Sequence, residues 1–134
     1  MKKVAIDFDS TLSRSDVQSY VRDLIKAGIE VWIVTSRYER TERYTFWMSD
    51  DDPRQSNQDL FAIAHELGIP KHRVIFTNME EKYKFFSGNH RMNFVFHLDD
   101  DFVELEGINS NTNVRGISSL NATYRQKCNN LLGL

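Results

Sequence analysis

The sequence has a single cysteine, no long hydrophobic run and almost no excess of either charge. Cys128 has no partner for an internal disulfide, so we expect a reducing, cytoplasmic environment. The net charge of −2 indicates no general affinity for nucleic acid or for membranes. The apolar run after Lys3 meets acidic residues at once, so it is too short for a signal peptide, and no later stretch is long enough to cross a bilayer. We therefore expect a soluble protein without a membrane partner.

The chain also lacks internal repeats and low-complexity tracts, and its composition is that of a folded protein. Hydrophobic residues make up 40% of the 134 positions, which is enough for a core and argues against disorder. We expect one domain covering residues 1–134, with a small insertion at about residues 38–56.

Short apolar runs alternate along the chain with segments of helical periodicity. Strands are expected at residues 4–8, 30–35, 73–77, 94–98 and 114–117. Helices are expected from Ser15 to Gly28 and at residues 57–67, 80–86 and 121–132. Ser15 and Gln18 fit a capping box, and Gly28 fits a helix end. This alternation predicts βαβ units in an α/β three-layer sandwich with a central parallel, Rossmann-like sheet.

Two of the expected strands end in acidic residues. Asp7 and Asp9 follow the first strand, with Thr11 close behind, and Asp99 and Asp100 follow the fourth. Strand side chains alternate, so Asp7 and Asp9, on either side of Phe8, are expected to point to the same side of an extended strand. Crowded carboxylates are costly unless a cation relieves them, and Mg²⁺ prefers oxygen ligands. The acidic residues therefore predict a Mg²⁺ site, although aspartates also end strands as turn formers or helix caps.

Other polar residues follow the remaining strands in a fixed order. Thr35 and Ser36 end the second strand, and Lys82 and Lys84 come after the third. The order DxDxT, then Thr or Ser, then Lys, then an acidic pair resembles the motif pattern of the haloacid-dehalogenase-like (HAD) superfamily, mostly Mg²⁺-dependent phosphatases and phosphotransferases. Response-regulator receivers use similar residues, but their second acidic position precedes the lysine, so the order excludes them.

The resemblance implies a role for each matching residue. Asp7 would be the nucleophile that becomes an aspartyl phosphate, and Asp9 the general acid and base. Thr35, in preference to Ser36, would hold a phosphoryl oxygen, although a β-branched residue in this place also fits an ordinary strand. Thr11 completes DxDxT and is expected to contact substrate.

The lysine and the metal ligands follow from the same resemblance. Lys82 would neutralise the phosphate and the nucleophile, with Lys84 as the alternative; either could instead lie on a solvated helix face. The implied Mg²⁺ ligands are Asp7, the backbone carbonyl of Asp9, Asp99 and Asp100. Of the second acidic group, Asp100 is the preferred direct ligand.

The insertion is too short for a full cap domain, so the chain resembles minimally capped members of the superfamily with open sites. Arg37, Arg40 and Arg43 recur every three residues and would bind a second phosphate or a nucleic-acid end. Aromatic residues interleave with them and would stack on a base: Tyr38, Tyr44, Phe46 and Trp47. The alternative is a surface helix in which Glu39 and Glu42 pair with the arginines. His97 is expected to be a packed core or edge histidine.

The sequence thus predicts a Mg²⁺-dependent phosphomonoester hydrolase that acts through an aspartyl phosphate. Its partner would be a phosphorylated small molecule, a nucleotide or a nucleic-acid end. Two alternatives stay open, a non-catalytic binding or scaffold protein with the same fold and a phosphotransferase whose acceptor is not water. The oligomeric state does not follow from the sequence.

Overall fold

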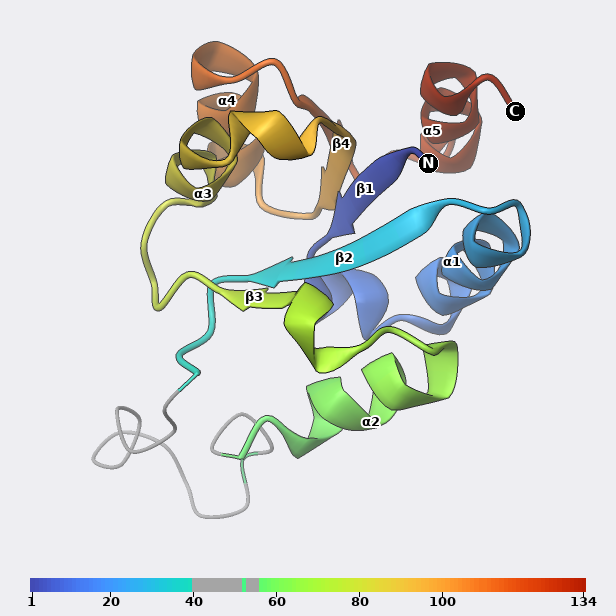
Figure 1. Cartoon of the computed structure of the whole chain (residues 1–134), viewed down its shortest axis with the longest axis vertical. Coiled ribbons are helices and arrows are strands. Elements are labelled where there is room, and N and C mark those ends of the chain that lie inside the picture. Colours follow the sequence, from blue (N-terminus) through green and yellow to red (C-terminus); the bar gives the residue numbers. More distant parts are fainter. Residues whose placement is uncertain (40–51, 53–55) are drawn as a thin grey trace.

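The computed structural model describes residues 1–39, 52 and 56–134. Its centre is a sheet of parallel strands in the order β3-β2-β1-β4-β5 (Figure 1). The strands are β1 (Lys3–Ile6), β2 (Glu30–Thr35), β3 (Val74–Phe76), β4 (Phe94–Asp99) and β5 (Arg115–Ser118). The predicted α/β architecture with a parallel, Rossmann-like sheet is confirmed.

Helices cover both faces of the sheet and make three layers (Figure 1). One face packs against α1 (Ser15–Lys26), α2 (Gln58–Leu67) and α5 (Tyr124–Leu132), and the other against α3 (Lys82–Gly88) and α4 (Phe102–Asn111). Short 3₁₀ turns, Lys71–Arg73 and His90–Met92, precede β3 and β4. Within the described residues, none of the helices has the length and apolar character needed to cross a bilayer.

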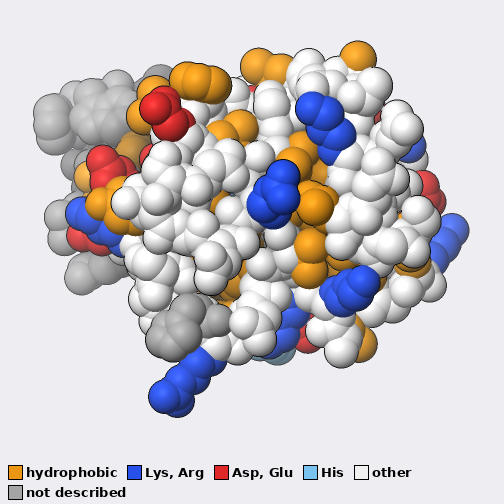
Figure 2. Space-filling model, turned by 90° about the horizontal axis from the view of Figure 1, so that it is seen from above, with side chains coloured by type: hydrophobic (Ala, Val, Ile, Leu, Met, Phe, Trp, Pro, Cys, Tyr) orange, Lys and Arg blue, Asp and Glu red, His pale blue; other side chains and the backbone are white. Residues whose placement is uncertain are grey.

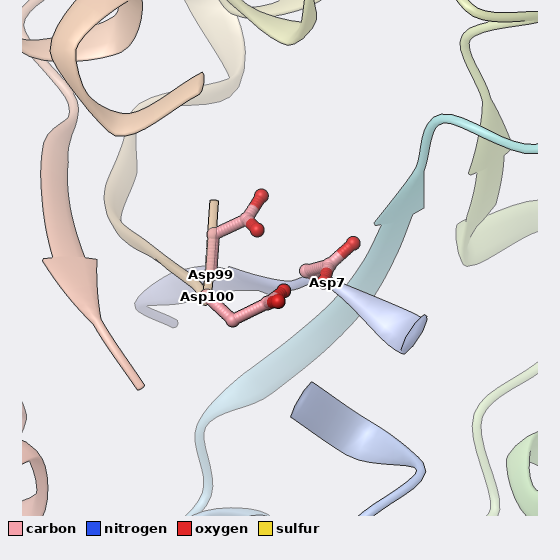
Figure 3. Close-up of side chains that lie close together, drawn as sticks. All are labelled: Asp7, Asp99 and Asp100. Carbon is pink, nitrogen blue, oxygen red and sulfur yellow. The ribbon is translucent and has the colours of Figure 1, made fainter. Parts of the chain in front are cut away.

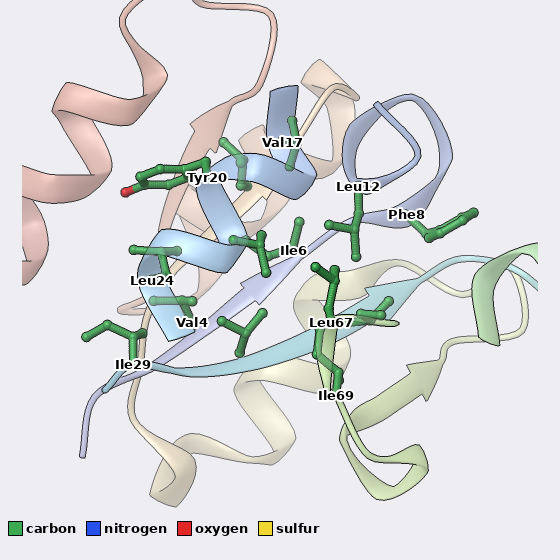
Figure 4. Close-up of a cluster of buried hydrophobic side chains, with 14 of the residues drawn as sticks. Val4, Ile6, Phe8, Leu12, Val17, Tyr20, Leu24, Ile29, Leu67 and Ile69 are labelled. Carbon is green, nitrogen blue, oxygen red and sulfur yellow. The ribbon is translucent and has the colours of Figure 1, made fainter. Parts of the chain in front are cut away.

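The central strand β1 supplies side chains to both layers of the core. Val4 and Ile6 point toward α1 in the larger cluster (Figure 4), while Ala5 joins the smaller cluster on the opposite face. All three are fully buried, as expected for a parallel strand covered on both faces. Burying a side chain such as Ile6 contributes about 1.5–3 kcal/mol to the stability of the fold. The strand that leads into the acidic site is therefore held in place by its buried side chains.

Strand β1 ends earlier than the sequence predicts, at Ile6 rather than at residue 8. Residues Phe8–Leu12 form a turn in which the dihedral angles of Asp9 and Ser10 are not helical, with Ser10 at a φ of 59°. The amide of Leu12 donates to the carbonyl of Asp7 at 3.0 Å, which closes this turn. The prediction that Asp7 and Asp9 share one side of an extended strand is therefore wrong, because the backbone between them bends.

One further local prediction is wrong, and one helix was not predicted. The capping box at Ser15 is absent, because Arg14 is the N-cap residue of α1 and the side-chain Nε2 of Gln18 donates to the carbonyl of Leu12 at 3.0 Å. The sequence pattern does not predict α4, whose apolar periodicity is weak; its N-cap Asp101 accepts from two backbone amides of the first turn. The expected glycine at the end of α1 is confirmed, with Gly28 at a φ of 84°.

Most of the expected insertion lies outside the described residues. These include five side chains for which the sequence predicts substrate contacts: Arg40, Arg43, Tyr44, Phe46 and Trp47.

Candidate functional site

The candidate site lies at the carboxyl ends of the central strands, where ligands bind in open α/β sheets. Asp7 follows β1, Asp99 ends β4 and Asp100 follows it. Oxygen atoms of these three carboxylates lie within 4.8 Å of one another. Figure 3 shows the side chain of Asp100 directed toward Asp7, with Asp99 beside them. The fold thus brings together acidic residues from opposite ends of the sequence.

Lys82, at the first position of α3, joins this cluster. Its ammonium Nζ donates to Asp7 Oδ1 at 2.7 Å and to Asp99 Oδ2 at 2.6 Å, and the side chain is only 2% exposed. Its backbone amide donates to Glu104 Oε2 at 3.0 Å, which ties α3 to α4. Lys84 is exposed. Of the two candidate lysines, the structure places Lys82 against the acidic residues.

Burial and charge act against each other in this cluster. Burial raises the pKa of Asp7 well above its ordinary value, and the charge of Lys82 opposes this only in part. Burial would also raise the pKa of Asp99, but hydrogen bonds from His97 and Lys82 and the charge of Lys82 hold it well below its ordinary value. Burial would lower the pKa of Lys82, yet the two carboxylates raise it. Lys82 and Asp99 therefore form a buried ion pair, and further positive charge is required to hold Asp7 ionised.

The donor set fits a hard divalent cation between Asp7 and Asp100. Asp99 is less available, because Oδ2 accepts from both Lys82 and His97 and Oδ1 accepts from the amide of Asp101 at 3.0 Å. Asp100 is partly exposed, and within the part of the chain that the structure describes its one side-chain donor is the hydroxyl of Thr11, at 3.4 Å. Carboxylate oxygens with access to water are the ligands that Mg²⁺ prefers.

Asp9 lies apart from this cluster and binds Arg37. The guanidinium, whose side chain is 3% exposed, donates from Nε and Nη2 to Asp9 Oδ2 and Oδ1 at 2.9 and 2.7 Å. On its other edge, Nη1 and Nη2 donate to Asp59 Oδ1 and Oδ2 at 2.7 and 2.9 Å. Asn57 Oδ1 lies 3.4 Å from Nη1, and the Phe8 ring packs 5.0 Å away. Arg37 is expected to bind phosphate, yet its donors are engaged by the chain itself.

The pKa of Asp59 is affected by its contact with Arg37. Burial would raise its pKa, but the hydrogen bonds and charge of Arg37 outweigh burial, so the pKa lies below its ordinary value. Asp59, in the first turn of α2, was not predicted as a site residue. Its only signal in the sequence is an acidic residue near the start of a helix, which is also a common helix feature.

The predicted hydroxyl residues lie at the same edge of the sheet. Thr35 ends β2, is fully buried, and its Oγ1 accepts from the amide of Arg37 at 3.3 Å. Ser36 is partly exposed. Thr11 is buried, and its hydroxyl lies 3.2 Å from that of Ser119, beyond β5. Thr11 thus connects the turn after β1 to β5 in addition to approaching Asp100.

If the acidic residues Asp7, Asp99 and Asp100 bind Mg²⁺, the metal should raise the thermal stability of the protein. Mg²⁺ bound only to the native state raises the free energy of unfolding by about 2.7 kcal/mol at a hundredfold excess over its dissociation constant. We expect millimolar Mg²⁺ to raise the melting temperature of the wild type, and Asp100→Asn to remove most of this shift. Asp101→Ser is the matched control, because serine preserves a helix cap. An equal shift in all three proteins would place the metal elsewhere.

Comparison with known proteins bears on the fold. No family model matches the chain, and no curated protein sequence matches it. A solved structure from Vibrio cholerae, described as a "putative 3-deoxy-D-manno-octulosonate 8-phosphate phosphatase", is similar with a TM-score of 0.51 and 15% sequence identity. The match covers 99% of this chain and 84% of that chain. At this identity the likeness shows the architecture alone, and it agrees with the predicted α/β sandwich around a parallel sheet.

Proposed function

We propose that the protein is a Mg²⁺-dependent phosphomonoester hydrolase that forms an aspartyl phosphate on Asp7. The observation that carries the proposal is the buried ammonium of Lys82, held between Asp7 and Asp99 at 2.7 and 2.6 Å, with Asp100 adjacent. A buried cation beside a carboxylate nucleophile is suited to a substrate that brings two negative charges. The phosphatase fold of the structural neighbour supports the same reading.

The chemistry assigned to the residues is a double displacement. A carboxylate oxygen of Asp7 attacks phosphorus, the bond to the leaving oxygen breaks, and Asp9 gives that oxygen a proton. In the second step Asp9 takes a proton from water, which attacks the phosphorus and releases inorganic phosphate and free Asp7. Lys82 would balance the charge of the phosphoryl group as Asp7 becomes esterified. Mg²⁺, held by Asp7 and Asp100 when bound, would supply charge stabilisation on the phosphoryl oxygens.

We further propose a nucleotide or a nucleic-acid end as the substrate. Exposed apolar side chains follow the carboxyl ends of β3, β4 and β5: Met79 (52% exposed), Phe102 (75%), Val103 (74%) and Leu120 (71%). They offer apolar area for a flat base near the acidic cluster. On the face in Figure 2, Lys and Arg side chains stand singly among hydrophobic and uncharged groups. The substrate proposal therefore rests on the exposed apolar side chains at the carboxyl ends of the strands.

The substrate proposal predicts a selective effect of Phe102→Ala. Base stacking on an aromatic side chain contributes about 1–3 kcal/mol, so we expect KM for nucleoside monophosphates to rise by roughly 5- to 100-fold. KM for sugar phosphates should change little. Leu134→Ala, another exposed apolar residue, serves as the control. Equal changes for both substrate classes would show that Phe102 does not contact a base.

The test of the function is phosphate release with Mg²⁺. Nucleoside monophosphates, sugar phosphates and 3′- or 5′-phosphorylated oligonucleotides would be compared, beside Asp7→Asn and a chelator. Turnover of one class, absent in both controls, would support the proposal. A folded protein that binds Mg²⁺ but releases no phosphate would favour the scaffold alternative. Phosphate found on an added alcohol or nucleoside would instead identify a phosphotransferase.

A further inference from the structure

His97 connects the core of the sheet to the candidate site. It lies on β4, is fully buried, and its Nε2 is 2.8 Å from Asp99 Oδ2. The same oxygen accepts from Lys82 Nζ at 2.6 Å, and Lys82 Nζ is 2.7 Å from Asp7 Oδ1. An unbroken line of contacts therefore runs from His97 through Asp99 and Lys82 to Asp7.

The direction of the first hydrogen bond follows from chemistry. An ionised carboxylate only accepts, so Nε2 carries the proton and donates to Asp99. Burial lowers the pKa of His97 more than the neighbouring carboxylate raises it. Its Nδ1 has no hydrogen-bond partner among the described residues. Among the described residues, Asp99 is the one side chain that the imidazole of His97 hydrogen-bonds, so this polar contact is made to the site.

Packing alone does not account for a histidine here. The flanking residues of β4, Phe96 and Leu98, are fully buried and apolar, and the Phe86 ring packs 5.3 Å from the imidazole. An unpaired buried ring nitrogen costs free energy that an apolar side chain in the same place would not. The imidazole is therefore expected to have a role that an apolar residue cannot supply.

That role concerns the orientation of Asp99. Its Oδ1 is fixed by the amide of Asp101 and its Oδ2 by His97, so the carboxylate is restrained from rotating about its terminal bond. Lys82 has a flexible four-carbon stem, and its ammonium adopts the position that its partners define. A fixed Asp99 therefore keeps the ammonium within reach of Asp7.

We propose that His97 is a positioning residue, whose Nε2–H orients Asp99 so that Lys82 remains against Asp7. The kinetic part of this inference rests on the proposed hydrolase function, whereas the position of the Lys82 ammonium does not. Loss of a side chain that orients a residue in direct contact with the reacting groups typically costs about 10- to 100-fold in activity.

The test compares His97→Leu with His97→Gln. Leucine removes the donor at similar bulk, and glutamine carries an amide N–H that can reach the position of Nε2. We expect His97→Leu to lower kcat by about 10- to 100-fold with KM within about threefold, and His97→Gln to recover most of kcat. Phe96→Leu, on the same strand, is the control for loss of packing and should leave kcat unchanged.

A second readout is independent of turnover. The ¹⁵N-labelled ammonium of Lys82 should give an exchange-protected NMR signal in the wild type, assigned with Lys82→Met. His97→Leu should shift or broaden this signal, and His97→Gln should retain it. If the wild type releases no phosphate while the signal responds in this way, the proposed hydrolase fails and the positioning role stands. An unchanged signal in His97→Leu, or a loss of kcat that glutamine does not recover, would overturn the inference.

Discussion

Replacing Lys82 by methionine is expected to lower the free energy of unfolding by about 3–5 kcal/mol at pH 7. The methionine preserves the length and bulk of the side chain but leaves Asp7 and Asp99 without their shared cation. Both carboxylates are almost completely buried, and an unpaired buried charge is far more costly than a broken surface pair. Urea denaturation of the two proteins without added metal measures the difference.

The pH dependence of this difference has a defined sign. In the wild type the pKa of Asp99 lies below its ordinary value, so its ionised form stabilises the fold above about pH 4, and this is lost on acidification. Without Lys82, burial raises the pKa of both carboxyls relative to the wild type, although Asp99 keeps its hydrogen bonds from His97 and from the amide of Asp101. A carboxyl with a raised pKa stabilises the fold only at low pH, where it is protonated. This contribution to the free energy of unfolding is lost as pH rises and the group ionises. The difference in the free energy of unfolding between Lys82→Met and the wild type should therefore be largest at neutral pH and decrease toward about pH 4.

Lys84→Met is the matched control, since Lys84 lies two positions later in the same helix and is exposed. Its effect should remain within about 0.5 kcal/mol at either pH. A Lys82→Met protein as stable as Lys84→Met at pH 7 would show that the buried ion pair is not formed in solution.

The fold and the position of the site were accessible from the sequence because each depends on local pattern. Apolar runs such as residues 30–35 have the length and composition of buried strands. Parallel strands place their carboxyl ends at one edge, so Asp7 and Asp99 could be expected to meet without knowledge of the packing. The choice between Lys82 and Lys84 was left open, because it depends on how α3 is rotated about its axis.

Features set by packing between distant elements could not be predicted. Asp59 and His97 resemble a helix-start acid and a core histidine, and only the assembled sheet shows what they contact. The divergence of Asp7 from Asp9 has a local cause, because the strand ends at Ile6 and Phe8, between the two aspartates, already belongs to the turn Phe8–Leu12. That turn also holds Ser10 at positive φ, a conformation that is uncommon for serine and that the strand pattern of the preceding residues does not predict.

The separation of Asp9 from Asp7 leads to the second large effect. As the proposed general acid, Asp9 contributes most when the leaving oxygen needs a proton. Asp9→Asn should lower kcat/KM by about 10²- to 10⁴-fold for an alkyl or nucleoside phosphate. The loss should be much smaller for p-nitrophenyl phosphate, because nitrophenolate leaves without protonation. Steady-state kinetics on the two substrates gives the comparison, and an equal loss on both would exclude Asp9 as the acid.

The role of Arg37 can be tested with the same two substrates, an alkyl or nucleoside phosphate and p-nitrophenyl phosphate. If the guanidinium serves to hold Asp9, as its bidentate contact at 2.7 and 2.9 Å indicates, then Arg37→Met should reproduce the leaving-group dependence of Asp9→Asn. If Arg37 instead binds the substrate phosphate, KM should rise for both substrates alike, because both carry the same phosphoryl group. Arg37→Met should lower the free energy of unfolding less than Lys82→Met does. The side chains of Asp9 and Asp59 are 47% and 30% exposed, so water can solvate them once the guanidinium is absent. The ratio of the two substrates therefore distinguishes an arginine that orients the acid from one that binds phosphate.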